Sequence, residues 1–273
     1  MCFYKLPEEI AMSLKRIRAI LAHELYITKH SYELINDLFL YPLWSIIIFG
    51  FMTIYIVGSG DQIIGKNVLL GIILWQIVNL VQYSISIGCL WDIWARNLTN
   101  IFITPISIGE YFTAYSLSGV VKAIIIMILA SLLAYFVFKF NILSLGLANL
   151  LLIFVNLAFF AISFGIIVLG LLFRFGTKIQ AFTWGLLTVF QPLMAVIYPV
   201  RVLPEPFRSL AYFFPPTYIF EAARYNLENK ATAWSNLFIA FILNLIFFLL
   251  AIYFFKLMFN KSKDLGKFAR LEG

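Results

Sequence analysis

Six long apolar runs dominate the pattern of hydrophobic and polar positions along this chain. They cover about residues 38–57, 68–90, 111–138, 147–173, 181–198 and 237–255. A helix needs about twenty mostly apolar residues to cross the hydrocarbon core of a bilayer, where its backbone groups must be hydrogen-bonded internally. The pattern predicts an all-α membrane protein with six transmembrane helices, forming one transmembrane domain over residues 1–273.

An amphipathic pattern precedes the first run, over residues 8–30. Apolar residues recur there at spacings of three and four, and polar or basic residues fall on the opposite helix face. The apolar positions are Ile10, Leu14, Ile17, Leu21 and Leu25, and the polar ones are Lys15, Arg16, His23 and Tyr26. This pattern is typical of a helix in the headgroup plane of a membrane. Packing on another protein surface is the alternative.

Composition and charge support a multi-pass protein of the cell membrane. Hydrophobic residues make up 63% of the chain and charged residues 12%, far from the balance of a soluble domain. The net charge of +7 does not indicate nucleic acid, because the basic residues flank the apolar runs, where they face anionic lipid. Thirteen lie on the side of the two termini and six on the other side. The positive-inside rule therefore predicts that both termini are cytoplasmic.

Signals of catalysis are weak. Residues 60–67 approach the nucleotide-binding pattern G-x-x-x-x-G-K-[ST], but Asn67 replaces the hydroxyl residue that contacts magnesium. The two histidines, His23 and His30, precede the first span, and no catalytic set faces the spans. We expect no enzyme activity, bound cofactor or metal in this chain.

Polar residues within the second span follow one helix face. Gln76, Asn79, Tyr83 and Ser86 recur at spacings of three and four. Polar groups are costly in lipid, so they should face other helices or a wet path. Hydrogen bonding between helices and a substrate path are equally compatible with this stripe.

Two further features of the spans are unusual. Tyr41, Trp44 and Tyr55 run through the first span, where they suit either a stacking surface for a substrate or ordinary packing. Lys122 lies about three turns into the third span. For it we expect a charge partner or a headgroup contact.

Two loops carry the strongest local signals. Residues 91–105 are helical in character up to a proline and suit a short cytoplasmic docking helix; a simple interfacial loop is the alternative. Five of the nine prolines fall in 199–216, which favours short re-entrant helices on the outer side. Glu221 and Arg224 follow at a spacing that lets them pair.

The order of these features resembles the membrane subunit of an ABC-2 type transporter over nearly the whole chain. The resemblance rests on the leader, the spans and three short motifs: Asn97-Leu98 with Thr104-Pro105-Ile106-Ser107, Tyr198-Pro199 with Leu203-Pro204, and Pro215-Pro216-Thr217-Tyr218. The family usually shows one proline followed by leucine where this chain has Pro215-Pro216, so no subfamily is assigned.

The resemblance implies a homodimer in the membrane with two copies of a separate ATP-binding subunit, which holds the ATP and magnesium. It implies export of a lipid-linked glycan, such as a polysaccharide or teichoic acid, or of an amphiphilic drug-like molecule. The predicted residues that couple to the ATPase are Arg16, Trp91, Asp92, Trp94, Arg96, Asn97 and Pro105. The predicted outer gate comprises Pro199, Pro204, Pro215, Pro216, Glu221 and Arg224. The predicted path comprises Tyr41, Trp44, Tyr55, Gln76, Asn79 and Tyr83, from spans one and two, together with span five. A membrane-embedded lipid-modifying enzyme and a non-ABC channel or scaffold are the competing hypotheses.

Overall fold

The computed structural model describes residues 12–58 and 62–264, which form helices and loops without a β-strand. Two ranges that carried predictions, 8–11 at the start of the leader and part of 60–67, lie outside the described residues. The α-helices are α1 (Leu14–His30), α2 (Tyr32–Ile35), α3 (Tyr41–Gly58), α4 (Gln62–Trp94), α5 (Leu98–Ile103), α6 (Ile108–Phe138), α7 (Leu147–Phe175), α8 (Ala181–Phe190), α9 (Phe207–Ala211), α10 (Pro215–Asn229) and α11 (Trp234–Asp264). A π-helical segment, η1 (Asn36–Leu40), joins α2 to α3, and short 3-10 helices are η2 (Ile142–Leu145), η3 (Gly176–Ile179), η4 (Gln191–Met194) and η5 (Val200–Val202).

Five helical stretches are long and apolar enough to cross a membrane. They are Tyr32–Gly58, Ile63–Trp94, Ile108–Phe138, Leu147–Ile179 and Trp234–Ser262. The all-α membrane fold is therefore confirmed. The fifth predicted span is shorter than expected, because its apolar helix covers only Ala181–Met194. The chain tightens into η4 at Gln191-Pro192, and Ala195 then takes a left-handed φ of 53° that ends the helix.

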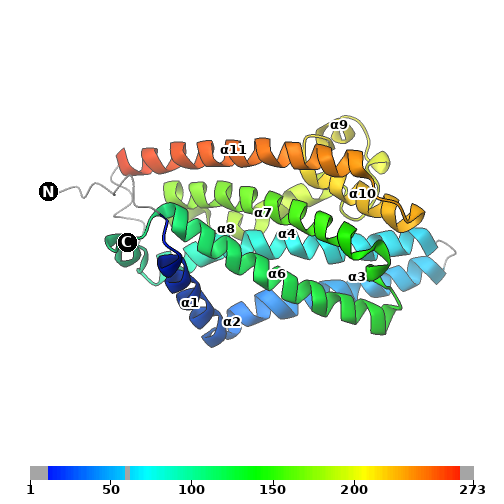
Figure 1. The fold of residues 1–273 in the computed structure, drawn as a ribbon, viewed down its shortest axis with the longest axis horizontal. Helices are drawn as coiled ribbons and strands as arrows, with labels where there is room; N and C mark the ends of the chain where they lie inside the picture. The colour runs from blue at the N-terminus through cyan, green and yellow to red at the C-terminus, as the bar shows by residue number, and fades with distance from the viewer. Residues whose placement is uncertain (1–11, 59–61, 265–273) are drawn as a thin grey trace.

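Helix α4 lies at the centre of the bundle. It packs against α3, α6 and α7, while α11 runs along α7 (Figure 1). Glycines allow two close contacts of α4: a Cβ on Gly119 of α6 would lie 3.0 Å from Cα of Val81, and one on Gly71 would clash with the carbonyl oxygen of Val196 in the turn after η4. Because α4 is surrounded by protein, its polar stripe faces other helices rather than lipid.

The two ends of the bundle differ in what they carry. Helices α1 and α2 and the C-terminal end of α11 lie at one end, and α9 and α10 lie at the other (Figure 1). The predicted leader helix is present as α1, but its packed face is partly polar. Ile17, Ile20, Glu24 and Thr28 are buried, whereas Leu14 is 72% exposed. Glu24 and Thr28 are buried because both bind Lys122 of α6.

Candidate functional site

A cavity of about 430 Å³ opens between α3, α4 and α8. Its wall includes four of the six predicted path residues, which are Tyr41, Gln76, Asn79 and Tyr83. Helix α8, the short fifth span, adds Thr183, Trp184 and Thr188. The structure thus places the aromatic start of α3, the polar stripe of α4 and the fifth predicted span around the same cavity. Trp44 and Tyr55 do not line it, and they are 60% and 81% exposed on α3.

The polar stripe divides into bonded and unbonded members. The Tyr83 hydroxyl donates to Asp37 Oδ2 at 2.7 Å. Ser86 Oγ accepts from Gln82 Nε2 at 2.7 Å, and the same amide donates to the Thr183 carbonyl at 3.3 Å. Gln76 is only 3% exposed, and its Oε1 has no hydrogen-bond partner in the described part of the chain. Hydrogen bonds between helices and within α4 therefore account for the polar groups of Tyr83 and Ser86. They do not account for Gln76 Oε1, which lies beside the cavity.

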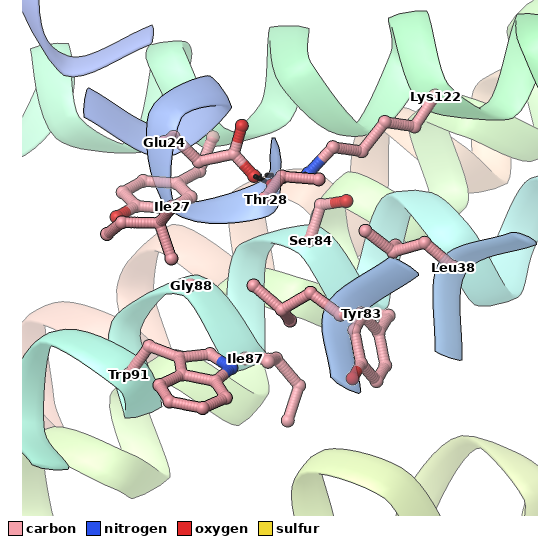
Figure 2. A pocket seen from close by; sticks show the side chains of 12 residues that line it. Glu24, Ile27, Thr28, Leu38, Tyr83, Ser84, Ile87, Gly88, Trp91 and Lys122 are labelled. Carbon is pink, nitrogen blue, oxygen red and sulfur yellow. Dashed lines mark hydrogen bonds and ion pairs between the residues drawn. The ribbon is translucent and has the colours of Figure 1, made fainter. Parts of the chain in front are cut away.

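Lys122 has the charge partner that its position predicts. Its Nζ forms an ion pair with Glu24 of α1 and donates to Thr28 Oγ1 at 3.1 Å (Figure 2). Ser118 donates to the second carboxylate oxygen of Glu24 at 2.6 Å. The adjoining cavity, lined also by Ser84, measures only about 20 Å³, room for about one water molecule. This cluster joins α1 to α6 and is too small to hold a substrate.

A second ion pair attaches the start of α1 to the start of α6. Arg16 Nε donates to Glu110 Oε1 and Oε2 at 2.8 and 2.9 Å. Glu110 also accepts from the backbone of Ser13 at 2.7 Å and closes a capping box with Ser107. Glu110 was not among the residues predicted from the sequence, although the Ser-x-x-Glu pattern at 107–110 before an apolar run is a signal for it.

The predicted coupling segment is divided between two helices and a turn. Trp91, Asp92 and Trp94 belong to the last turns of α4, which is longer than predicted, and α5 is a separate short helix. Asp92 is buried and accepts from the hydroxyls of Tyr111 and Tyr115 at 2.6 and 2.8 Å. These contacts attach α4 to α6.

Three other members of the coupling set are accessible. Trp94, Arg96 and Pro105 are exposed, and Asn97 is half-buried. Arg96 ends α4 with a left-handed φ of 52°. Ile103 of α5 is also exposed, at 71%, and α5 lies at the same end of the bundle as α1 (Figure 1). Coupling through these residues stays a prediction.

The predicted gate residues surround one network at the opposite end. Arg224 Nη1 donates to Glu221 Oε1 at 3.0 Å, and Nη2 donates to the carbonyl oxygens of Ala195 and Val196. Glu221 Oε1 accepts from the backbone of Val200 at 2.8 Å. The predicted pair is therefore present, and it fastens the turn after α8 to α10.

The four gate prolines lie around this network at different depths. Pro215 and Pro216 are buried at the start of α10, whereas Pro199 is half-buried and Pro204 is exposed. Burial of Arg224 lowers its pKa, and the neighbouring Glu221 opposes that shift. Gating by this segment stays a prediction.

Comparisons with known proteins agree with this arrangement. A search of curated proteins found no match. The sequence profile of the family described as ABC-2 type transporter matches residues 17–227, a range that runs from α1 to α10 and contains the cavity, the Lys122–Glu24 ion pair and the Arg224 network. Since that match covers more than half of the chain, the protein belongs to the ABC-2 type transporter family and is the multi-pass membrane component of a transporter.

Proposed function

We propose that this chain is the transmembrane subunit of an ATP-driven exporter, which works as a homodimer with a separate ATP-binding subunit. The cavity between α3, α4 and α8 is the observation that supports the proposal most. It combines aromatic rings with amide and hydroxyl groups inside a bundle of apolar helices. Such a hollow suits a cargo with both a polar and an apolar part, either a lipid-linked glycan or an amphiphilic drug-like molecule.

The exposed face of α3 supports a homodimer. Large apolar side chains cover this face beside the cavity, and its members are Trp44, Ile48, Phe51, Met52 and Tyr55. Val189 of α8 is 71% exposed. Two copies that meet along α3 and α8 would place Trp44 and Tyr55 along a path shared by the two subunits.

The ATPase would bind at the end that carries α1 and α5. The exposed residues of the predicted coupling segment include Trp94, Arg96, Ile103 and Pro105, and α5 lies near α1 (Figure 1). Both ion pairs of α1 lead to α6, so displacement of α1 by the ATPase would be passed to a spanning helix. In this proposal the ATPase holds the ATP and magnesium, the cargo moves from the cytoplasmic side outward, and the α8–α10 segment caps the exit.

Co-expression and co-purification with a candidate ATP-binding subunit of an ABC transporter tests the proposal. We expect a complex in which the chain raises ATP turnover, and we expect Ile103→Asp to lower that stimulation. Trp234→Asp is the matched control, because Trp234 is 67% exposed at the start of α11, which lies at the opposite end and outside the proposed cap. An ATPase that does not bind the chain, or whose turnover responds equally to both substitutions, would contradict the coupling proposal.

A further inference from the structure

A second hollow lies on the outside of the bundle, between α6 and α7. This groove of about 810 Å³ is lined by apolar side chains of the two helices, with Ser131 among them. Ser131 donates to the carbonyl oxygen of Met127 at 2.5 Å, so its hydroxyl is already bonded. Ile128, Leu132, Leu147 and Leu151 are between 49% and 79% exposed. The groove therefore presents an apolar concave wall to the surroundings of the bundle.

The length of the groove corresponds to one leaflet of a bilayer. It extends along α6 from Ile124 to Tyr135, which is about 16 Å at 1.5 Å per residue. The hydrocarbon core of a bilayer is about 30 Å thick, so the groove covers about half of it. Both helices are candidate spans, which puts the groove at the depth of acyl chains.

Three lysines lie in a pocket next to this groove, which we call the mouth of the groove. A neighbouring pocket of about 490 Å³ is lined by Lys66, Lys139 and Lys230, and it shares Asn141 with the groove. Asn141 Oδ1 accepts from the backbone of Leu143, which leaves its amide N–H groups available as donors. Among the residues that the structure describes, Glu228 is the one carboxylate of the pocket lining. The mouth is therefore cationic.

These lysines are notable because basic residues are rare at this end. Six basic residues occur on this side of the predicted spans, and three of them line this pocket. Arg208 and Arg224 donate to backbone carbonyl groups and pair with carboxylates. Within the described part of the chain, none of the three lysines forms an ion pair. Contacts among the described residues 12–58 and 62–264 thus do not account for their charge.

We propose that the α6–α7 groove binds an anionic phospholipid, with its acyl chains along the groove and its phosphate among Lys66, Lys139 and Lys230. An apolar trough one leaflet long with a cationic mouth is complementary to such a lipid in both shape and charge. A zwitterionic lipid fits the groove equally well but gains less at the lysines. The site lies outside the cavity between α3, α4 and α8, so the proposal does not depend on the cargo or on the ATPase.

Native mass spectrometry of the chain in mild detergent tests this site. Phosphatidylglycerol and phosphatidylcholine with identical acyl chains serve as probes. We expect wild type to prefer phosphatidylglycerol. A triple variant, Lys66→Gln with Lys139→Gln and Lys230→Gln, should lose about tenfold in affinity for phosphatidylglycerol and keep its affinity for phosphatidylcholine. All three lysines are exposed, so the variant should fold. An unchanged preference would overturn the proposal.

Three further arms separate the alternatives. Ser131→Phe, or Val155→Trp if that variant fails to fold, should weaken both lipids because it fills the groove. A matched triple variant at the other end carries Lys15→Gln, Lys29→Gln and Lys178→Gln. The first lipid that it binds should still be phosphatidylglycerol in preference to phosphatidylcholine. Displacement of phosphatidylglycerol by inorganic phosphate would show a simple anion site instead. Loss of the dimer mass on filling the groove would show that a second copy occupies it, and either result would overturn the proposal.

Discussion

Lys122 in the third span forms an ion pair with Glu24 of the leader helix, 98 residues earlier in the chain. Both side chains are less than a tenth exposed, and Thr28 and Ser118 complete their hydrogen bonds. A lysine in a membrane span is tolerated here because α1 supplies a carboxylate at that depth. The pair fixes α1 against α6.

Removing one member of this pair should cost more than removing both. Lys122→Met leaves the Glu24 carboxylate buried without its cation, and we expect the free energy of unfolding to fall by about 3–5 kcal/mol. Glu24→Gln should have a smaller effect in the same direction, because the amide still bonds Ser118. The combined variant should recover part of the loss. Denaturant unfolding in detergent measures this, and additive losses would contradict the pairing.

Glu110 should be more important for stability than its partner Arg16. The Glu110 carboxylate accepts from Arg16 and from the backbones of Ser13 and Ser107, and it is fully buried. Glu110→Ala leaves several donors unsatisfied, so we expect a loss of about 2–4 kcal/mol, whereas Arg16→Ala should lose about 1–2 kcal/mol. The same unfolding assay compares them. Equal losses would mean that the backbone contacts contribute nothing beyond the ion pair.

The helices themselves were predictable from the sequence, because apolar runs of sufficient length have few alternatives. The early end of the fifth span was not, since Gln191-Pro192 and the left-handed Ala195 lie within an apolar run that hides the turn. The burial of Glu24 was also missed, since local periodicity cannot reveal a partner in a distant span. The contacts of Asp92 with Tyr111 and Tyr115 were not predictable for the same reason, and its role in coupling stays a prediction.

Gly71→Ala should displace the outer segment. A Cβ at Gly71 would meet the carbonyl oxygen of Val196, a backbone atom that a side-chain rotation cannot move away. We expect a loss of about 1–3 kcal/mol in unfolding free energy. Gly185→Ala is the matched control, because nothing lies within 4 Å of its Cβ position. That variant should be neutral or slightly stabilising, since alanine favours a helix. Similar effects of both substitutions would contradict the close contact of α4 with this segment.

The topology can be tested with single cysteines at the two ends of the bundle. Ile103 at the end of α5 is 71% exposed, and Val202 in η5, just before α9, is 63% exposed. Helices α5 and α9 lie at opposite ends of the bundle (Figure 1). In a Cys2→Ser background, with Cys89 buried, a membrane-impermeant maleimide should label Val202→Cys in intact cells. Ile103→Cys should react only after the cells are permeabilised. The reverse pattern would place the termini outside and would refute the proposed direction of transport.

Gln76 offers a test that separates a path residue from a packing residue. Its buried Oε1 has no partner within the described residues and borders the cavity, whereas the Gln82 amide bonds Ser86 and Thr183. Gln76→Leu removes an unsatisfied buried acceptor, so stability should stay equal or rise. Transport should nevertheless fall by about tenfold if the cargo donates to that oxygen.

Gln82→Leu should do the opposite for stability, with a loss of about 1–3 kcal/mol, because the partners of the amide stay buried. ATP-dependent uptake of a labelled glycolipid or an amphiphilic dye into inverted vesicles measures transport, and unfolding in detergent measures stability. Tyr41 lines the cavity and is 68% exposed. Tyr41→Leu should therefore lower transport without lowering stability, as Gln76→Leu does. If Gln76→Leu destabilises the fold and leaves uptake intact, the α4 stripe serves packing and the cavity is not the path.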